Sequence, residues 1–288
     1  MYWVLKNKKL FLLDIDGTVA VGDKIIDGTF EFLDYISDIN GKYVFITNNS
    51  SKSIEMYVDS FKKYGFNVDE SNFITASYAT GVYLKKRYNS KKIFALGTKS
   101  FINELKTFDL NITEELEDEI ACSVAAYDNE LTYKKIEKIC ELLIKNPKMD
   151  YVATNPDLVC PVSFGYVPDC GSICMMIENA TKRKPIFIGK PNKFIVDICL
   201  EKYNYSPEET LIIGDRLYTD ILCGMNMDID TCLVLSGEAD ENDLNKSKYR
   251  PTFVFNSIQD LYDNLKRGKW NFIVQTKYCS NYFVLNIK

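Results

Sequence analysis

Short apolar runs alternate with amphipathic stretches along the chain, and this alternation constrains the fold more than any other feature of the sequence. Runs such as 10–13 and 211–213 have the length and apolar character of buried strands. Stretches such as 29–39 and 193–203 have the mixed spacing of helices that bury one face. Strands and helices in turn are typical of a mostly parallel sheet, so the sequence predicts an α/β fold.

The same pattern predicts two alternating sets, one inserted into the other. The first set is expected to resume with a strand at Phe187 and Ile188 that returns to the first sheet. Linkers are expected at Ala76-Ser77 and Lys184-Pro185. The predicted division is a core domain at 1–77 and 186–268, an inserted α/β domain at 78–185, and a C-terminal tail at 269–288 of unknown role. Further strands are expected at 43–46, 73–75, 93–96, 123–126, 151–153, 233–235 and 252–255, and further helices at 51–64, 100–106, 132–145, 219–225 and 259–266.

Composition argues against several kinds of partner. The net charge of -5 and the pI near 5.1 provide no basic field for counterion release, so no nucleic-acid partner is expected. The apolar run before Asp14 is too short for a signal sequence, and no later stretch approaches the roughly 18 apolar residues that span a bilayer. We therefore expect no membrane association and a cytoplasmic location. Nine cysteines without a C-x-x-C pair fit a reduced compartment, and Cys170 and Cys174 are interpreted as core residues at a helix start.

No histidine occurs in the chain. Its absence excludes Ser-His-Asp and Cys-His catalysis, phosphohistidine chemistry and histidine-ligated zinc sites. No cysteine is followed six positions later by arginine, so the loop of cysteine-dependent phosphatases is absent as well. Neither G-x-G-x-x-G nor G-x-x-x-x-G-K-[ST] occurs, which weakens dinucleotide and nucleoside-triphosphate interpretations. Catalysis would have to use carboxylates, Lys, Thr, Ser or Cys.

Asp14 and Asp16 follow directly on an apolar strand, in the segment DIDGT. Residues two apart on a strand point the same way, so both carboxylates are expected at the carboxyl end of the strand, where open α/β sheets bind ligands. Two carboxylates so close repel each other unless a cation shares the site, and oxygen ligands suit Mg²⁺. One could then attack phosphorus while the other handles protons. An ordinary turn after a strand is the alternative interpretation.

Three further polar segments end expected strands of the core. Thr47 and Asn48 precede a helix whose N-terminal N–H groups favour an anion, although an ordinary helix cap would use the same residues. Lys190 stands before a proline, where a solvated lysine is the simpler interpretation. Asp215 and Asp220, five residues apart, are either hard-metal ligands or part of a capped helix start.

The order and spacing of these four segments together resemble the haloacid dehalogenase superfamily, which uses an aspartate nucleophile on a Rossmann-like core. The large insertion between the threonine and lysine segments is similar to the NagD-like or 4-nitrophenylphosphatase-like branch. The segments TNPD at 154–157 and GDRLYTDI at 214–221 strengthen this narrower resemblance, which covers roughly residues 8–267. It implies a Rossmann-like parallel-sheet core with a large inserted α/β cap domain that closes over the phosphate site.

The resemblance also implies a role for each of the site residues. Asp14 would be the nucleophile and a magnesium ligand. Asp16 would protonate the leaving group and later activate water, with its main-chain carbonyl also on the metal. Asp215 would complete the protein ligands of Mg²⁺, and Asp220 would orient the water shell of the metal. The transferring phosphoryl group would be held by Thr47 and Asn48, and its charge balanced by Lys190.

The implied function is a Mg²⁺-dependent phosphatase that hydrolyses a small phosphomonoester through a phospho-aspartate intermediate. A nucleoside monophosphate, a sugar phosphate and phosphoglycolate remain open as substrates. Phosphotransfer to a metabolite acceptor and a noncatalytic ligand sensor on the same fold are the alternatives. The expected partner is a small phosphorylated metabolite, and a homodimer formed through the cap follows only by analogy.

Some positions depart from the family pattern. Asp169 and Cys170 stand where relatives often carry a glycine-rich turn, and whether they alter the specificity of the cap is open. Asp228 stands where a helix-ending glycine is common, and Asp tolerates the left-handed conformation required there. Phe164 and Tyr166 in the cap could stack on a base, but core packing is the preferred expectation.

Overall fold

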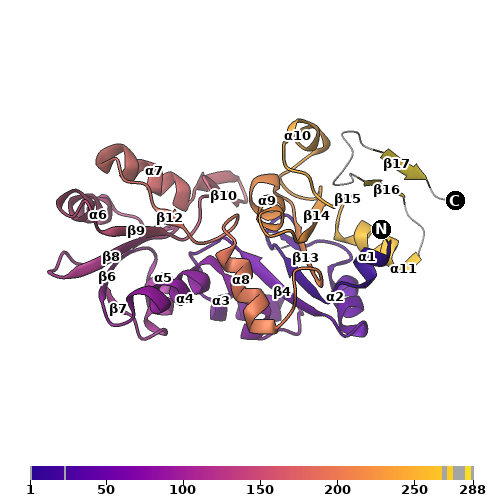
Figure 1. Cartoon of the computed structure of the whole chain (residues 1–288), viewed down its shortest axis with the longest axis horizontal. Helices are drawn as coiled ribbons and strands as arrows, with labels where there is room; N and C mark the ends of the chain where they lie inside the picture. Colours follow the sequence, from indigo (N-terminus) through magenta and orange to yellow (C-terminus); the bar gives the residue numbers. More distant parts are fainter. Residues whose placement is uncertain (1, 23, 268–270, 275–282, 287–288) are drawn as a thin grey trace. The chain divides into compact units, whose positions relative to one another are not determined.

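The computed structural model describes residues 2–22, 24–267, 271–274 and 283–286 (Figure 1). The chain forms two compact units, each with its own sheet. Unit 1 comprises residues 1–46, 62–73 and 191–288, and unit 2 comprises residues 47–61 and 74–190. Parallel strands alternate with helices in both, so the predicted α/β class is confirmed.

The larger sheet contains eight strands, and the pairings at its centre are parallel. β1 pairs in parallel with β13 and β4, and β13, β14 and β15 continue in parallel, whereas β16 and β17 are antiparallel. The order across the sheet is β17 (Phe283–Asn286), β16 (Asn271–Val274), β15 (Phe253–Phe255), β14 (Asp230–Val234), β13 (Thr210–Gly214), β1 (Leu10–Leu13), β4 (Lys42–Thr47) and β5 (Phe73–Thr75).

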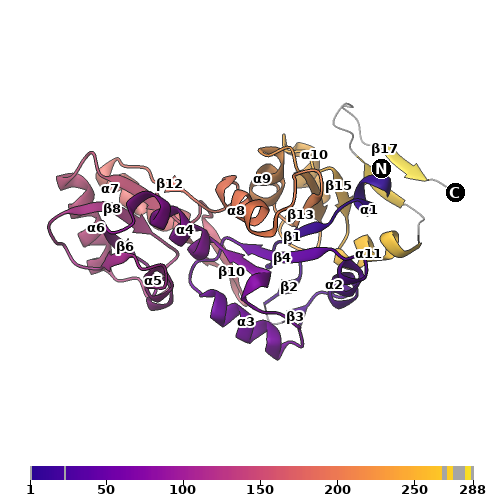
Figure 2. The ribbon, with the colours of Figure 1, turned by 60° about the horizontal axis from the view of Figure 1, so that its bottom comes forward.

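The centre of this sheet is apolar on both faces, as expected for a parallel sheet covered by helices. All four residues of β1 are buried, and Phe11 contacts Phe32 of α2 (Thr29–Asp38) edge to face, with ring centroids 5.8 Å apart. Figure 2 shows α2 beside α11 (Ile258–Arg267). The remaining helices of unit 1 are α1 (Tyr2–Lys6), η1 (Glu70–Asn72), α8 (Phe194–Tyr203), η2 (Leu217–Ile221), α9 (Leu222–Met225) and α10 (Glu241–Lys246), and a small hairpin joins β2 (Ala20–Val21) to β3 (Lys24–Ile25).

Unit 2 has a five-stranded parallel sheet and a separate hairpin. Its core includes Cys170 and Cys174, which pack with Ile139 and Tyr151, so the interpretation of both cysteines as core residues is confirmed. The strand order is β12 (Ile186–Phe187), β9 (Asp150–Ala153), β8 (Ile120–Ala125), β6 (Lys92–Leu96) and β7 (Asn111–Thr113), and the hairpin is β10 (Val159–Val162) with β11 (Gly165–Pro168). The helices are α4 (Ala76–Tyr88), α5 (Lys99–Lys106), α6 (Tyr133–Lys145) and α7 (Cys170–Thr181), and most of α3 (Ile54–Lys63) belongs here too.

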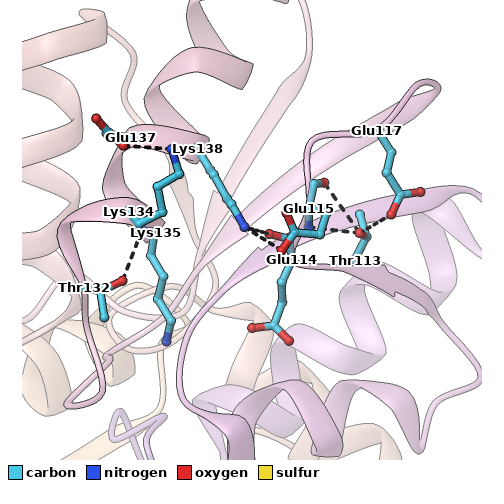
Figure 3. A network of polar contacts seen from close by, with 9 residues as sticks. All are labelled: Thr113, Glu114, Glu115, Glu117, Thr132, Lys134, Lys135, Glu137 and Lys138. Carbon is cyan, nitrogen blue, oxygen red and sulfur yellow. Dashed lines mark hydrogen bonds and ion pairs between the residues drawn. The ribbon is translucent and has the colours of Figure 1, made fainter.

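Charged side chains connect α6 to the segment after β7 on the surface of unit 2 (Figure 3). Lys138 pairs with Glu115 at 2.6 Å, and the Thr113 hydroxyl donates to the carboxylate of Glu117 at 2.6 Å. Exposed ion pairs of this kind contribute only about 0.2–1 kcal/mol each. They therefore add little to the stability of the unit.

One expectation about the chain path was wrong. Phe187 does not return to the first sheet, because β12 pairs in parallel with β9 of unit 2. The main-chain N–H of Ile188 donates to Ala153 at 3.0 Å and so continues that pairing. The helix expected at 219–225 is confirmed, although its first part belongs to the π-helix η2 and only its second part is the α-helix α9.

The expected linker at Ala76-Ser77 lies at the start of α4, where the Thr75 hydroxyl oxygen accepts the N–H of Tyr78. The predicted domain boundaries stay a prediction. The predicted tail at 269–288 lies outside the described residues except for β16 and β17. Within the described part of the chain, no helix combines the length and the apolar character needed to cross a membrane.

Candidate active site

Three buried aspartates of unit 1 gather at the carboxyl end of β1 and β13. Asp14, Asp215 and Asp220 each offer a carboxylate oxygen, and these oxygens all lie within 4.8 Å of one another. Asp14 directly follows β1, and its N–H donates to the carbonyl of Ile213 in β13 at 2.8 Å. Because the two strands are parallel neighbours, the residues that follow each strand meet at one edge of the sheet.

Asp220 reaches this edge through the π-helix η2. The N–H of Ile221 donates to the carbonyl of Arg216 at 3.2 Å, a bond that spans five residues. The carboxylate of Asp220 turns back to accept the N–H of Arg216 at 3.1 Å. The family resemblance implied that Asp220 orients the water shell of the metal, but nothing in the sequence indicated the wide helical turn that brings its carboxylate so close to Asp215.

Burial and mutual repulsion raise the pKa of Asp215 to about 7, with desolvation as the larger cause and the neighbouring Asp220 as the next. The N–H of Glu238, which donates to Oδ2 of Asp215 at 2.6 Å, opposes this rise. Oδ1 of the same carboxylate is buried and has no hydrogen-bond partner among the described residues. Such an oxygen is costly unless a proton or a cation satisfies it.

Three positions next to the cluster can hold only glycine, because a side chain there would collide with a carboxylate of the cluster. A Cβ at Gly17 would lie 2.3 Å from Oδ2 of Asp215, and one at Gly237 would lie 2.0 Å from the same atom. A Cβ at Gly214 would lie 2.2 Å from Cγ of Asp220. Closely packed carboxylate oxygens, together with a buried oxygen of Asp215 that has no partner among the described residues, suit a hard divalent cation such as Mg²⁺. The residues present therefore fit the metal that the sequence predicted.

Asp16 lies beside this cluster in the chain but is not one of the three aspartates. It is partly buried and forms an isolated bridge with Ala20, and the N–H of Gly17 donates to the carbonyl of Ala20 at 2.8 Å. Gly17 has a φ of +88°, which a residue with a side chain rarely adopts. This tight turn holds the main chain at Asp16 in one conformation.

The other predicted site residues, Thr47, Asn48 and Lys190, belong to unit 2 and are all buried. Thr47 ends β4, and its hydroxyl oxygen accepts the N–H of Asn49 at 3.1 Å. The side-chain amide of Asn48 donates to the main-chain carbonyl of Lys190 at 2.9 Å and to the carboxylate of Asp157 at 3.1 Å. The structure therefore brings Asn48 and Lys190 together, although they are far apart in the sequence.

Sequence reasoning missed two buried polar residues of unit 2. Ser50 shares a hydrogen bond with the hydroxyl of Thr154 at 2.8 Å, and its hydroxyl oxygen accepts the N–H of Tyr127 at 3.0 Å. Glu104 of α5 accepts the N–H of Ile54 at 3.3 Å, and burial raises the pKa of its carboxyl to about 7. A signal for Glu104 existed, because its spacing from Phe101 places it on the apolar face of the helix.

The expectation that Phe164 and Tyr166 pack in a core was wrong. Phe164 is 81% exposed and Tyr166 is 60% exposed, since the hairpin of β10 and β11 forms a two-stranded sheet of its own.

Asp169 caps α7 and also accepts the side-chain amide of Asn155 at 3.1 Å. Asp228 has a φ of 55°, which confirms that it takes the left-handed conformation.

Known proteins share both the sequence pattern and the fold. Residues 11–111 match a family model described as haloacid dehalogenase-like hydrolase, and residues 187–261 match one described as HAD-hydrolase-like. The ribonucleotide monophosphatase NagD of Escherichia coli (strain K12) is 31% identical over 253 residues, which cover 88% of this chain and 98% of NagD. The chain belongs to the haloacid dehalogenase-like hydrolases.

Two further members of this hydrolase family place the chain in the same branch. The crystal structure of a 4-nitrophenylphosphatase from Thermotoga maritima aligns with a TM-score of 0.86 and 38% identity, covering 91% of this chain and 99% of that one. An acid sugar phosphatase of Staphylococcus saprophyticus is 28% identical over 91% of this chain and 100% of its own length. The chain is thus a phosphoric monoester hydrolase of the NagD-like or 4-nitrophenylphosphatase-like branch, in a family whose phosphatases use a divalent metal ion.

Proposed function

We propose that this hydrolase is a Mg²⁺-dependent phosphatase that cleaves a small phosphomonoester through a phospho-aspartate on Asp14. The observation that carries the proposal is the cluster of buried carboxylate oxygens of Asp14, Asp215 and Asp220, all within 4.8 Å of one another. A divalent cation would relieve the repulsion between three carboxylates so close to one another at neutral pH. When bound, Mg²⁺ would supply positive charge against the phosphoryl oxygens and lessen the repulsion between the phosphate and Asp14.

In the first step, a carboxylate oxygen of Asp14 forms a bond to phosphorus while the bond from phosphorus to the ester oxygen breaks. Asp16 gives its proton to that leaving oxygen. In the second step, water attacks phosphorus, Asp16 takes the proton of the water, and inorganic phosphate leaves with Asp14 restored. Thr47, Asn48 and Lys190 are proposed to hold the phosphoryl group, with the lysine ammonium balancing its charge.

The proposed substrate is a sugar phosphate or a nucleoside monophosphate, with phosphoglycolate as a third candidate. The names of the relatives support the first two, because one is an acid sugar phosphatase and another a ribonucleotide monophosphatase. A cytoplasmic location and a homodimer formed through the domain at 78–185 belong to the same proposal.

The test is phosphate release from 4-nitrophenyl phosphate and a panel of small phosphomonoesters, with Mg²⁺ and with a chelator. Asp14→Asn is compared with Asp38→Asn, which changes an exposed aspartate of α2 in the same unit. We expect activity to need Mg²⁺, to fall to background in Asp14→Asn and to survive in Asp38→Asn. Activity that persists in Asp14→Asn would eliminate the nucleophile assignment.

Two outcomes would favour the alternatives. Transfer of phosphate to an added metabolite in preference to water would indicate a phosphotransferase. Binding of phosphate esters by the wild-type protein without any turnover would indicate a ligand sensor.

A further inference from the structure

We propose that Asp157 is a positioning residue for Lys190 and acts through the side-chain amide of Asn48. The inference rests on the proposed function, because the position of Lys190 affects catalysis only if its ammonium group contacts the phosphoryl group. All the residues that carry it belong to unit 2. Asp157, Asn48 and Lys190 are each more than nine-tenths buried, so the bonds between them are little weakened by competing water.

The side-chain amide of Asn48 has two N–H donors, and the protein uses both. One donates to Oδ2 of Asp157 at 3.1 Å, and the other donates to the main-chain carbonyl of Lys190 at 2.9 Å. A carboxylate and a carbonyl can only accept, so these two neighbours also decide which end of the amide carries nitrogen. The Asn48 side-chain amide therefore bridges the carboxylate of Asp157 and the main-chain carbonyl of Lys190.

This arrangement changes what the Asn48 side chain can do for a phosphate. Its remaining polar atom, Oδ1, is buried without a hydrogen-bond partner among the described residues, and a Cβ at Gly189 would lie only 2.5 Å from it. An amide oxygen repels a phosphoryl oxygen, and no side-chain donor is left. Any contact from Asn48 to the phosphoryl group would come from its main-chain N–H, while its side chain holds Lys190.

Asp157 is itself fixed by its neighbours. Its main-chain carbonyl accepts the N–H of Gly171 at 2.8 Å, at the start of α7. A Cβ at Gly171 would lie 2.7 Å from that carbonyl oxygen, so only glycine allows the helix to approach so closely. The N–H of Gly189 donates to the carbonyl of Thr154 at 2.7 Å, which ties the segment before Lys190 to the segment before Asp157. The Asp157 carboxylate is thus held in place, and through the Asn48 amide it positions the main chain of Lys190.

The test compares Asp157→Ala with Asp169→Ala. Asp169 is a matched control, since it is equally buried in the same unit and accepts the amide of Asn155 at the same distance of 3.1 Å. We expect both variants to lower the melting temperature. Only Asp157→Ala should lower kcat for 4-nitrophenyl phosphate, by about 10-fold to 100-fold, the range that is typical when a partner that orients a metal ligand is removed. Asp157→Asn, which keeps an oxygen acceptor, should recover most of the loss.

A double variant distinguishes action through Asn48 from an independent effect. If Asp157 acts through the Asn48 amide, then Asn48→Ala combined with Asp157→Ala should be no slower than the slower of the two single variants. Losses that multiply would overturn the inference, and so would a kcat in Asp157→Ala that matches the kcat of Asp169→Ala.

Two measurements do not need catalysis. In the wild-type protein, the Asn48 side-chain amide should show slow hydrogen exchange by NMR, and this protection should be lost in Asp157→Ala. Inorganic phosphate should bind at least several-fold more weakly to Asp157→Ala than to Asp169→Ala. The wild-type protein could hydrolyse no ester while the exchange and phosphate-binding results are both as expected. The proposed function would then be wrong, and the positioning role of Asp157 toward a bound phosphate would still be supported. An Asn48 amide that exchanges rapidly in the wild-type protein would overturn the positioning role whatever the activity.

Discussion

The main-chain N–H of Glu238 donates to Oδ2 of Asp215 across 2.6 Å, while Oδ1 of the same carboxylate is buried without a hydrogen-bond partner among the described residues. One oxygen is held by the protein and the second is left without a partner, and the carboxylate offers one oxygen to the cluster that it forms with Asp14 and Asp220. A metal ion that takes the second oxygen would find it already oriented.

Mg²⁺ binding should therefore stabilise unit 1 measurably. At a free concentration of 100 times Kd, a ligand that binds only the folded protein adds about 2.7 kcal/mol to the free energy of unfolding. We expect this gain in thermal unfolding of the wild-type protein and of Asp38→Asn, and expect Asp215→Asn to lose it. Equal stabilisation of Asp215→Asn by Mg²⁺ would show that Asp215 is not a ligand.

Gly214→Ala should impair the metal site without replacing any of its three aspartates. The new Cβ would lie 2.2 Å from Cγ of Asp220, so the carboxylate must move. We expect weaker Mg²⁺ binding by calorimetry and a lower kcat. Gly65→Ala is the control. Gly65 is exposed and has a φ of +94°, so alanine strains the backbone there, but at a position far from the three aspartates in the sequence. Similar Mg²⁺ affinity in both variants would contradict this account.

Glu104 should make the stability of the protein depend on pH. Its carboxyl has a pKa of about 7 in the folded protein against an ordinary value of 4.5. Between these values the unfolded chain has lost the proton and the folded protein keeps it, so stability falls as pH rises and the loss is complete above about pH 7. Glu104→Gln, whose amide oxygen can still accept the N–H of Ile54, should lack this dependence.

The measurement for Glu104 is urea denaturation of both proteins from pH 4.5 to 7.5. The stability of the wild-type protein relative to Glu104→Gln should fall by about 3 kcal/mol over that range. Parallel pH profiles would mean that the carboxyl titrates normally.

Lys8 should contribute to stability and not to catalysis. Its ammonium group is buried, pairs with Asp230 at 2.7 Å and donates to the carbonyl of Glu208 at 2.7 Å. Lys8→Met leaves the carboxylate of Asp230 without its cation, and we expect a loss of about 3 kcal/mol in the free energy of unfolding with kcat retained. Lys6→Met, at an exposed position of α1, should change stability by less than about 0.5 kcal/mol. Equal effects of the two variants would contradict this prediction.

Much of the fold could be predicted because its signals are local. The strand at Leu10–Leu13 and the strand at Phe73–Thr75 have the predicted bounds, since an apolar run bounded by polar residues specifies a buried strand by itself. The helices α2 and α6 differ from prediction by one residue at one end, where helix bounds are least defined. The path of Phe187 could not be predicted, because two residues carry no information about which of two sheets they join.

The sequence by itself determined the chemistry of this protein: aspartates after apolar strands, no histidine, and a spacing that identifies the family. Those features depend on residue type and order, which a sequence states directly. Only the tertiary structure decided which groups share a site, because proximity comes from strand order and helix geometry. Parallel pairing of β1 with β13 brings Asp14 to Asp215, a π-helical turn brings Asp220 to both, and a buried amide connects Asp157 to Lys190.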